Sequence, residues 1–464
     1  MVNVVPFHSY RPIPAAAAEY AALPYDVLNR TEAAAEITAR PLSFLRIDKT
    51  TALMPLGVGE YDQRVYTRAR ELLNADERAG IIIPEPDGKP HYYLYRLAEG
   101  SGLAESPTDN PAASPSLDSP TDNLTDNPAA SPAEGNSGVR HTQIAQHTQI
   151  AQHAQTVQHT QIGIVACVSV DDYNNGVIKR HENTRAHKRH DRVEHIAKLG
   201  AHTGPVLMAH RSHEQINAAI TATVGSVEPL YDFQAADGVF HTVWRIDDTA
   251  VEAAIQQAFS EIEALYIADG HHRAAAAAIV GEKKGGEAAF FLAALFSAEQ
   301  LKILDYNRVV FDLYDHSLDE FLKLVSARFE LCELPSTQEP YRPKRRGEIG
   351  MYAQGTWYRL VIPEETRPAE PVAQLDVSIL QERLLDPILG IDDPRSSKRV
   401  AYVGGVRGLE ELKYRAEATS GVAFSLYPCS IDELFAVADA GELMPPKSTW
   451  FEPKPRSGLF IHKI

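Results

Sequence analysis

Five consecutive residues, Asp269 to Arg273 (sequence DGHHR), stand between an apolar stretch, LYIA, and a run of alanines. This pattern predicts a strand that ends near Asp269 and a helix that begins near Gly270. The first turn of a helix has free backbone N–H groups and a positive dipole end, and both favour anions. Phosphate is the usual anion at such a turn. The sequence therefore predicts a phosphate-binding turn at this junction.

Each residue of the turn has groups suited to phosphate chemistry. Gly270 allows a close backbone approach or a positive φ. Arg273 offers a fork of donors, while His271 and His272 can donate to phosphate oxygens or pass a proton near neutral pH. Asp269 could orient an imidazole, hold a divalent cation or accept a proton from a hydroxyl. The alternative is that Asp269 caps the helix and the two histidines are packing residues.

A second polar segment, residues 176–196, is basic within a chain that is otherwise acidic. It predicts a helix from about residue 184, with four cations on one face: Arg185, Lys188, Arg189 and Arg192. With Arg180, this face predicts an anionic ligand. Glu182 lies just ahead of the helix, where neighbouring cations would keep it ionised and available as a base. The alternative is an ordinary solvated helix face, and the histidines of this segment lack the HExxH spacing of a zinc site.

A third candidate segment, LMPPKSTWFEPKPRSGL, spans residues 443–459. Its PKST stretch lacks the upstream glycines of a Walker A loop, so that match is discarded. Lys447 and Lys454, each following a proline, could still close over a phosphate. An ordinary basic tail explains the segment equally well.

These motifs lie among short apolar strands and amphipathic helices. The sequence predicts strands at 43–47, 79–84, 264–269 and 302–313, and helices at 60–74, 184–199, 251–260, 317–328 and 374–387. Strands and helices interspersed in this way predict a mixed α/β or α+β fold. The order is too irregular for a TIM barrel or a doubly wound sheet, and no GxGxxG follows a strand.

A low-complexity insert interrupts the chain between residues 98 and 162. It contains near-copies of the sequence TDNPAASP and four six-residue repeats rich in His and Gln. Such a composition buries too little apolar surface to repay its ordering entropy, so we expect disorder there. Without it, HYYLYRL and IGIVACVSV would pair as a hairpin. The predicted domains are a core of residues 1–97 and 163–310 and a C-terminal α/β region of residues 311–464.

Composition limits the classes of partner. The net charge of −17 argues against a nucleic-acid-binding protein, because phosphate backbones are bound by clustered Lys and Arg. No apolar run approaches the roughly 20 residues that a membrane helix needs. The first residues lack the basic region and apolar core of a signal peptide, so we expect a cytoplasmic location and no membrane partner. The oligomeric state stays open.

Six motifs in order resemble one microbial family. They are PYDVL, SVDDY with IKRHENT, IADGHHR, LDYNRVV, LLDPILGI and the terminal PPKSTWFEPKPRSGL. Together they are similar to the domain-of-unknown-function family 1015 (DUF1015) over nearly the entire chain, except the 98–162 insert. The family name itself implies no activity.

The DGHHR element is also similar to the signature of the ParB/sulfiredoxin superfamily, and within it to free-serine kinases of the SerK type. This resemblance implies a ParB/sulfiredoxin-like core with additional N- and C-terminal elements. It implies that Asp269 and His272 act at the phosphoryl-transfer site and that His271 and Arg273 hold phosphate. Glu182 would correspond to the base that activates the substrate hydroxyl. His271 occupies the place of the sulfiredoxin cysteine, which argues against that redox activity.

The leading hypothesis is a phosphotransferase that uses ATP or ADP with Mg²⁺ and takes a small hydroxyl compound, with free L-serine as the suggested acceptor. The predicted catalytic residues are Glu182, Asp269 and His272. The predicted phosphate- and nucleotide-binding residues are Gly270, His271, Arg273, Arg180, Lys188, Arg192 and Lys447. Two alternatives stay open: a ParB-like nucleotide-binding regulatory protein, and a metal-dependent hydrolase that uses Asp269, His271 and His272. A metal site is not otherwise indicated.

Overall fold

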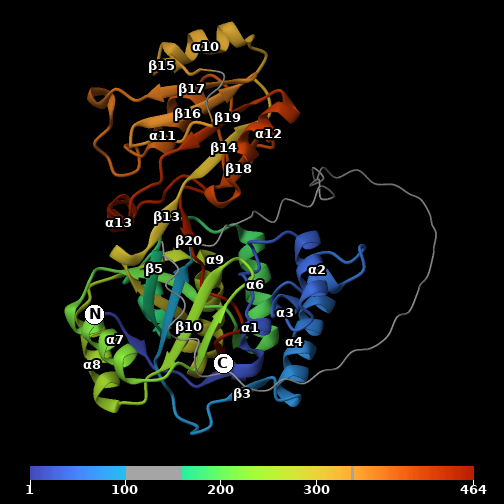
Figure 1. Cartoon of the computed structure of the whole chain (residues 1–464), viewed down its shortest axis with the longest axis vertical. Helices are drawn as coiled ribbons and strands as arrows, with labels where there is room; N and C mark the ends of the chain where they lie inside the picture. Colours follow the sequence, from blue (N-terminus) through green and yellow to red (C-terminus); the bar gives the residue numbers. More distant parts are fainter. Residues whose placement is uncertain (101–158, 336–338) are drawn as a thin grey trace, which may run out of the picture.

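The computed structural model describes residues 1–100, 159–335 and 339–464. It contains helices and strands throughout, which confirms the mixed α/β prediction. Figure 1 shows two lobes, one above the other. The C-terminal lobe, residues 306–440, contains a six-stranded sheet, and the core lobe contains a nine-stranded sheet. The predicted ParB/sulfiredoxin-like character of the core stays a prediction.

The nine-stranded sheet combines parallel and antiparallel pairs. Its order is β6-β11-β8-β12-β5-β4-β10-β9, and β1 also pairs with β5. Only the β6–β11 and β8–β12 pairs are parallel among the described strands. The bounds are β1 Val4–Val5, β4 Tyr93–Glu99, β5 His159–Ser169, β6 Ile178–Lys179, β8 Val206–His210, β9 Tyr231–Gln234, β10 Val239–Arg245, β11 Leu265–Asp269 and β12 Phe290–Ser297.

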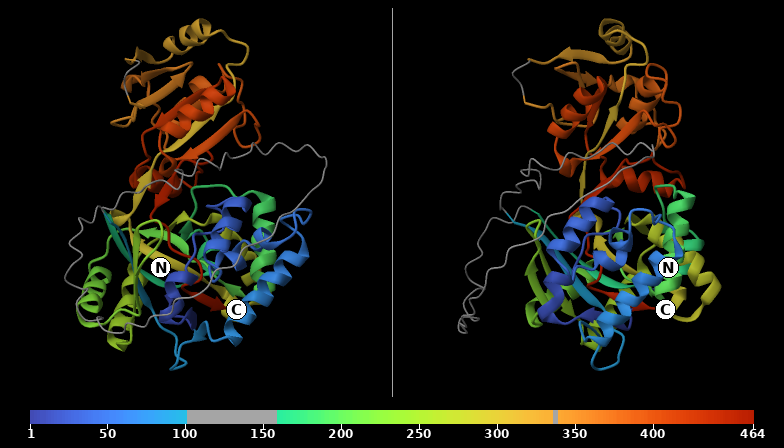
Figure 2. Two further views of the ribbon diagram at one scale, coloured as in Figure 1. Left: turned by 45° about the vertical axis from the view of Figure 1, so that its right-hand side comes forward. Right: turned by 90° about the vertical axis from the view of Figure 1, so that its right-hand side faces the viewer.

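Helices cover this sheet and extend it on one side. They are α1 Ala17–Tyr20, α2 Arg30–Ala39, α3 Leu45–Asp48, α4 Gln63–Arg78, α5 Val170–Asn174, α6 Ala186–Leu199, α7 Glu214–Ser226, α8 Thr249–Glu261 and α9 His271–Lys284. The alanines of α9 are buried, and their small side chains let α6 lie close against it. Both figures of the whole chain show α6 beside the N-terminal helices α2 to α4 (Figures 1 and 2).

One predicted strand is wrong. Residues 43–47 end in helix α3, and Phe44, Leu45 and Ile47 are fully buried in a cluster with residues of α2 and α4. A short apolar run has the same composition in a buried strand and in a buried helix, so the local sequence could not separate the two. The other predicted strands and the predicted helices overlap observed elements.

The predicted hairpin is confirmed. Strands β4 and β5 pair antiparallel from Tyr93 and Val165 to Glu99 and His159. The strands therefore extend into the predicted insert at both of its ends, because ladder hydrogen bonds involve the backbone and tolerate polar side chains. Residues 101–158, which hold the remainder of that insert, lie outside the described residues.

The C-terminal lobe is built on an antiparallel sheet of order β15-β17-β16-β19-β14-β18. The strands are β14 Tyr306–Val310, β15 Glu330–Glu333, β16 Glu348–Ala353, β17 Thr356–Val361, β18 Val400–Gly404 and β19 Val422–Leu426. The helices are α10 Leu318–Ser326, α11 Asp376–Leu380, α12 Glu410–Thr419 and α13 Ile431–Asp439. Helix α13 contacts the core lobe: the rings of Phe435 and Tyr266 stack 3.8 Å apart, and Asp439 accepts a hydrogen bond from Tyr266.

The last residues of the chain return to the core lobe. Strand β20 (Trp450–Glu452) pairs with β13 (Lys302–Leu304), and β21 (Ile461–Lys463) lies between β2 (Ser9–Pro12) and β7 (Ala201–His202) in a four-stranded sheet that β3 (Ile82–Pro84) completes. This return brings Lys447 and Lys454 back to the core. The division of the chain at residue 310 stays a prediction. Among the described residues, no helix is long and apolar enough to cross a membrane.

Because Glu99 and His159 are paired, a short turn can close this hairpin. We expect that replacing residues 100–158 by Asn-Gly leaves the thermal midpoint within about 5 °C of the full chain, since closure of a loop depends only weakly on its length. Differential scanning calorimetry of both chains measures this. A broad or missing unfolding transition in the shortened chain would contradict the prediction.

Candidate functional site

The turn between β11 and α9 has the predicted form. Gly270 precedes the helix with φ 97°, and no side chain caps the first turn of α9. A Cβ at this position would lie 3.0 Å from the guanidinium of Arg273, so both the backbone angle and the space favour glycine. The first turn of α9 also lacks an acidic side chain. Its free N–H groups can therefore bind an anion.

Asp269 is held by two cations. Lys454 Nζ donates to Oδ1 at 2.6 Å, and Arg273 Nη2 donates to Oδ2 at 3.1 Å. The other nitrogen of Arg273, Nη1, donates to the carbonyl of Pro205 at 2.6 Å. Burial alone would raise the pKa of Asp269, but the charges of Lys454 and Arg273 lower it well below its ordinary value. Such a carboxylate is a weak base and a strong anchor for the turn.

Parallel pairing of β6 with β11 brings Glu182 to this turn. Lys179 pairs with Tyr266, and Glu182 and Asp269 each follow their paired residue by three positions. The carboxyl ends of parallel neighbouring strands lie at the same edge of a sheet. The sheet thus brings together two residues that are far apart in the sequence.

The histidines at this edge are neutral at physiological pH. The rings of His181 and His271 meet edge to face, 4.5 Å apart, and burial lowers the pKa of each to about 3. Burial also lowers the pKa of His272, although Glu182 opposes the shift. His272 is only partly buried, and its Nδ1 has no hydrogen-bond partner among the described residues. A neutral imidazole can donate one hydrogen bond and accept one.

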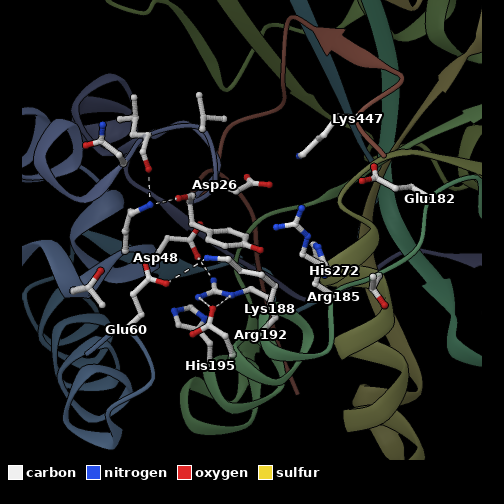
Figure 3. Close-up of a pocket in the computed structure, with 18 of the residues that line it drawn as sticks. Asp26, Asp48, Glu60, Glu182, Arg185, Lys188, Arg192, His195, His272 and Lys447 are labelled. Carbon is white, nitrogen blue, oxygen red and sulfur yellow. Dashed lines mark hydrogen bonds and ion pairs between the residues drawn. The ribbon is translucent and has the colours of Figure 1, made fainter. Parts of the chain in front are cut away.

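A cavity of about 610 Å³ opens beside this edge, a size typical of small-molecule sites. Its walls come from α2 to α4, the 182–195 segment, the start of α9 and the C-terminal lobe. Five of the predicted site residues line it: Glu182, Lys188, Arg192, His272 and Lys447. Figure 3 shows Lys447, Glu182 and His272 facing this space together with Asp26 and Arg185.

The other predicted site residues are not among those that line the cavity: Arg180, Asp269, Gly270, His271 and Arg273. His271 is buried behind the turn, and Arg180 is exposed beside the ring of Tyr173. The catalytic and binding roles assigned to the ten residues stay predictions.

Several charges in the cavity neutralise each other. Arg192 is buried and pairs with Asp191 at 2.7 Å and with Asp48 at 3.4 Å. Lys188 pairs with Glu60 at 3.3 Å. Arg407, from the C-terminal lobe, pairs with Glu32 at 3.5 Å across the cavity rim. Arg192 is thus already engaged by carboxylates, which limits its capacity to bind a phosphate.

Five charged side chains in the cavity form no hydrogen bond or ion pair with any other residue that the structure describes. Three are cations, Arg185, Arg395 and Lys447, and two are the carboxylates Asp26 and Glu182. Sequence reasoning missed Asp26 and Arg395. Asp26 lies in the PYDVL motif, whose proline and aspartate were a weak signal, while Arg395 carries no local signal at all.

Buried contacts fix the loop that carries Lys447. The amide of Met444 donates to the carbonyl of His181 at 2.8 Å, and Arg308 Nη2 donates to the carbonyl of Pro446 at 3.1 Å. Lys447 has φ 58°, and its Nζ lies 5.6 Å from the ring of Tyr306. Burial alone would lower the pKa of Lys447, but Tyr306 and nearby carboxylates raise it above its ordinary value. A charged ammonium group is therefore held at the cavity wall.

Metal-ligating side chains do not cluster at this turn. In the described part of the chain, the one group of three possible ligands is Asp87, His91 and Asp247, and none of the three lines the cavity. Asp269, His271 and His272 therefore do not form a three-ligand metal centre in this structure. A hydrolase built on them lacks geometric support.

The fold and the site define a mixed α/β protein with a charged cavity between two lobes, beside the uncapped start of helix α9. The family model described as "Protein of unknown function (DUF1015)" matches residues 4–105 and 142–378. The chain belongs to this family. Comparison with curated proteins gives no match.

Solved structures give distant likenesses only. SbnI with a C-terminal truncation, from Staphylococcus aureus, is 13% identical with a TM-score of 0.34, over 64% of this chain and 85% of that chain. A free serine kinase in complex with AMP is 13% identical with a TM-score of 0.32, over 64% and 91%. A conserved hypothetical protein from Pyrococcus furiosus is 16% identical with a TM-score of 0.32, over 64% and 94%. We draw nothing on function from these likenesses.

Substitution of Lys454 tests the anchor of the turn. We expect Lys454→Met to lower the free energy of unfolding by about 3 kcal/mol at pH 7, because it leaves Asp269 with one cation. The folded pKa of Asp269 is depressed, so its stabilisation is present above about pH 4 and is lost as the pH falls further. The difference between wild type and variant, measured by urea unfolding, should therefore shrink below pH 4.

Lys302→Met is the matched control. Lys302 lies on β13 and pairs with Glu99, and its side chain is more exposed than that of Lys454. It should cost at most about 1 kcal/mol. Equal costs for the two variants would contradict the anchoring role of Lys454.

Substitution of Arg308 tests how Lys447 is positioned. Arg308→Met removes the hydrogen bond to Pro446, so the loop should loosen and Lys447 should react faster with an acetylating reagent. Mass spectrometry after timed labelling measures the rate, with Lys413 on α12 as the internal reference. An unchanged rate at Lys447 in a folded variant would exclude this role, and Arg308→Lys should restore part of the protection.

Proposed function

We propose that this protein is a nucleotide-dependent phosphotransferase that acts on a small hydroxyl compound, with free L-serine as the first acceptor to test. The observation that carries the proposal is the joint presence of Lys447, His272 and Glu182, which has no partner in the described part of the chain, in one cavity beside the uncapped start of α9. Phosphoryl transfer needs mainly positioning and neutralisation of charge, and these groups supply both.

Glu182 is the proposed base. Its carboxylate has no partner among the described residues, whereas both oxygens of Asp269 are engaged by Lys454 and Arg273. In the step, the acceptor oxygen forms a bond to the terminal phosphorus while the bond from that phosphorus to the nucleotide oxygen breaks. The hydroxyl proton goes to Glu182, and the shortened nucleotide leaves.

Asp269 and Gly270 set the position of the turn, and Lys447 neutralises the transferred phosphoryl group. His272 donates a hydrogen bond to it as a neutral imidazole. Arg273 and His271 support the turn from behind, through Pro205 and His181. In this proposal the two residues assigned to phosphate by resemblance act indirectly.

ATP or ADP is the proposed donor, together with Mg²⁺. Asp26 lines the cavity without a partner among the described residues, so its carboxylate would hold the magnesium ion, and oxygen ligands are those that magnesium prefers. Bound magnesium would neutralise charge on the phosphates. The acidic side chains of the cavity therefore fit the ion, and the cations fit the nucleotide phosphates.

The proposal is tested by incubating the purified protein with ATP or ADP, Mg²⁺ and L-serine, and by measuring phosphoserine by mass spectrometry. Glu182→Gln should lower the transfer rate at least about 100-fold, the usual effect of losing a general base. It should leave ADP affinity, measured by calorimetry, nearly unchanged. His272→Ala should lower both the transfer rate and the affinity for ADP.

Glu214→Gln is the control, because Glu214 lies in the first turn of α7 and does not line the cavity. ADP binding without phosphoserine from any small hydroxyl acceptor would favour the nucleotide-binding regulatory alternative. Absence of any nucleotide binding would contradict both functions.

A further inference from the structure

We propose that the acceptor bound in this cavity carries an anionic group of its own, and that Arg395 of the C-terminal lobe and Arg185 of the core lobe hold it. This inference rests on the proposed function in one respect: it takes the start of α9 and Lys447 as the position of the transferred phosphate. It goes further because it assigns a second anion subsite and a class of substrate.

The first support is the balance of charges in the cavity. Three ion pairs account for Arg192, Lys188 and Arg407. Lys49 donates to the carbonyls of Tyr25 and Leu28. Three cations are then left over, and Lys447 alone is assigned to the transferred phosphate. Arg185 and Arg395 then line the cavity without an ion pair among the described residues, although the charge of Arg395 helps to lower the pKa of Asp393 in its own loop. Guanidinium groups suit carboxylate and phosphate because their donors form a planar fork.

The second support is that the two arginines reach one cavity from different lobes. Arg185 directly precedes α6, and Arg395 lies in the loop before β18. The hydroxyl of Tyr402 donates to the carbonyl of Pro394 at 2.7 Å, which anchors that loop next to Arg395. Burial raises the pKa of Tyr402, while the charges of Arg308, Arg185 and Lys447 oppose the shift, so Arg185 lies within electrostatic reach of the tyrosine that anchors the Arg395 loop.

The third support is the setting of these arginines. Both side chains are exposed toward the cavity and the solvent, so an incoming ligand does not have to break a buried ion pair. The contact between Arg407 and Glu32, at 3.5 Å with both side chains partly exposed, is weak and can rearrange around a ligand. A ligand with one anion at α9 and another at Arg395 would bridge the two lobes.

The experiment compares two compounds that differ in one anionic group. Calorimetry measures binding of 3-phosphoglycerate, which has a phosphate and a carboxylate, and of glycerol 3-phosphate, which lacks the carboxylate. Propane-1,3-diol bisphosphate, with a second phosphate, shows which anion the subsite prefers. We expect 3-phosphoglycerate or the bisphosphate to bind at least about tenfold more tightly than glycerol 3-phosphate, because a charged hydrogen-bonded pair is added.

Arg395→Ala and Arg185→Ala should each remove most of this advantage and leave the affinity for glycerol 3-phosphate within about twofold of wild type. Arg415→Ala on α12 is the control, since Arg415 pairs with Glu411 on the same helix and does not line the cavity. Thermal midpoints show that the variants fold.

Equal binding of the three compounds, no binding of any of them, or an advantage that survives both arginine variants would overturn the second subsite. These outcomes are distinct from failure of the proposed function, which is measured as transfer of phosphate. A protein that binds doubly anionic compounds through Arg395 but transfers nothing would retain the subsite and lose the kinase proposal.

Discussion

The contact between Lys454 and Asp269 links the end of strand β11 to the last segment of the chain. Asp269 holds the turn that begins α9, and Lys454 belongs to the segment that returns from the C-terminal lobe. Separation of the pair would leave a buried charge without a partner, which costs free energy. The pair therefore fixes the returning segment to the turn between β11 and α9. Lys447, a few residues earlier in that segment, is thereby held at the wall of the cavity beside this turn. Arg308 and Tyr306 fix its loop from the side of the C-terminal lobe.

Burial decides the charge states around this contact. His181 and His271 lose their positive charge because they are buried, although the nearby carboxylate of Asp269 opposes the shift of both pKa values. Lys447 and Arg192 keep theirs because carboxylates or a tyrosine lie within reach. The positive potential at the cavity therefore comes from lysine and arginine side chains. The histidines contribute hydrogen bonds and shape, which a count of basic residues in the motif does not reveal.

The C-terminal lobe is part of the site. Helix α13 rests on β11 through Phe435 and Asp439, and the loop before β18 supplies Arg395 to the cavity wall. Since β11 ends at the proposed anion-binding turn, any movement of this lobe would act on that turn and on the cavity wall that holds Arg395. A ligand that contacts both lobes would stabilise their present arrangement, because it adds contacts only when they are close.

The sequence by itself determined the elements with strong local signals. The DGHHR turn, the paired strands on either side of the insert and the amphipathic helix α6 follow from periodicity, glycine and charge, which act over a few residues. The strand predicted at residues 43–47 was wrong because an apolar run of that length does not specify its own geometry. Tertiary packing of Phe44 and Ile47 made it a helix.

Only the tertiary structure decided which charges meet. Parallel pairing of β6 with β11 placed Glu182 beside a turn that is far away in the sequence, and the returning segment placed Lys447 and Lys454 there. Asp26, which has only the weak signal of the PYDVL motif, entered the cavity from the N-terminal region, and Arg395 entered it from the C-terminal lobe without any motif. Electrostatic interactions depend on distance in space, and the sequence carries that distance only through the fold.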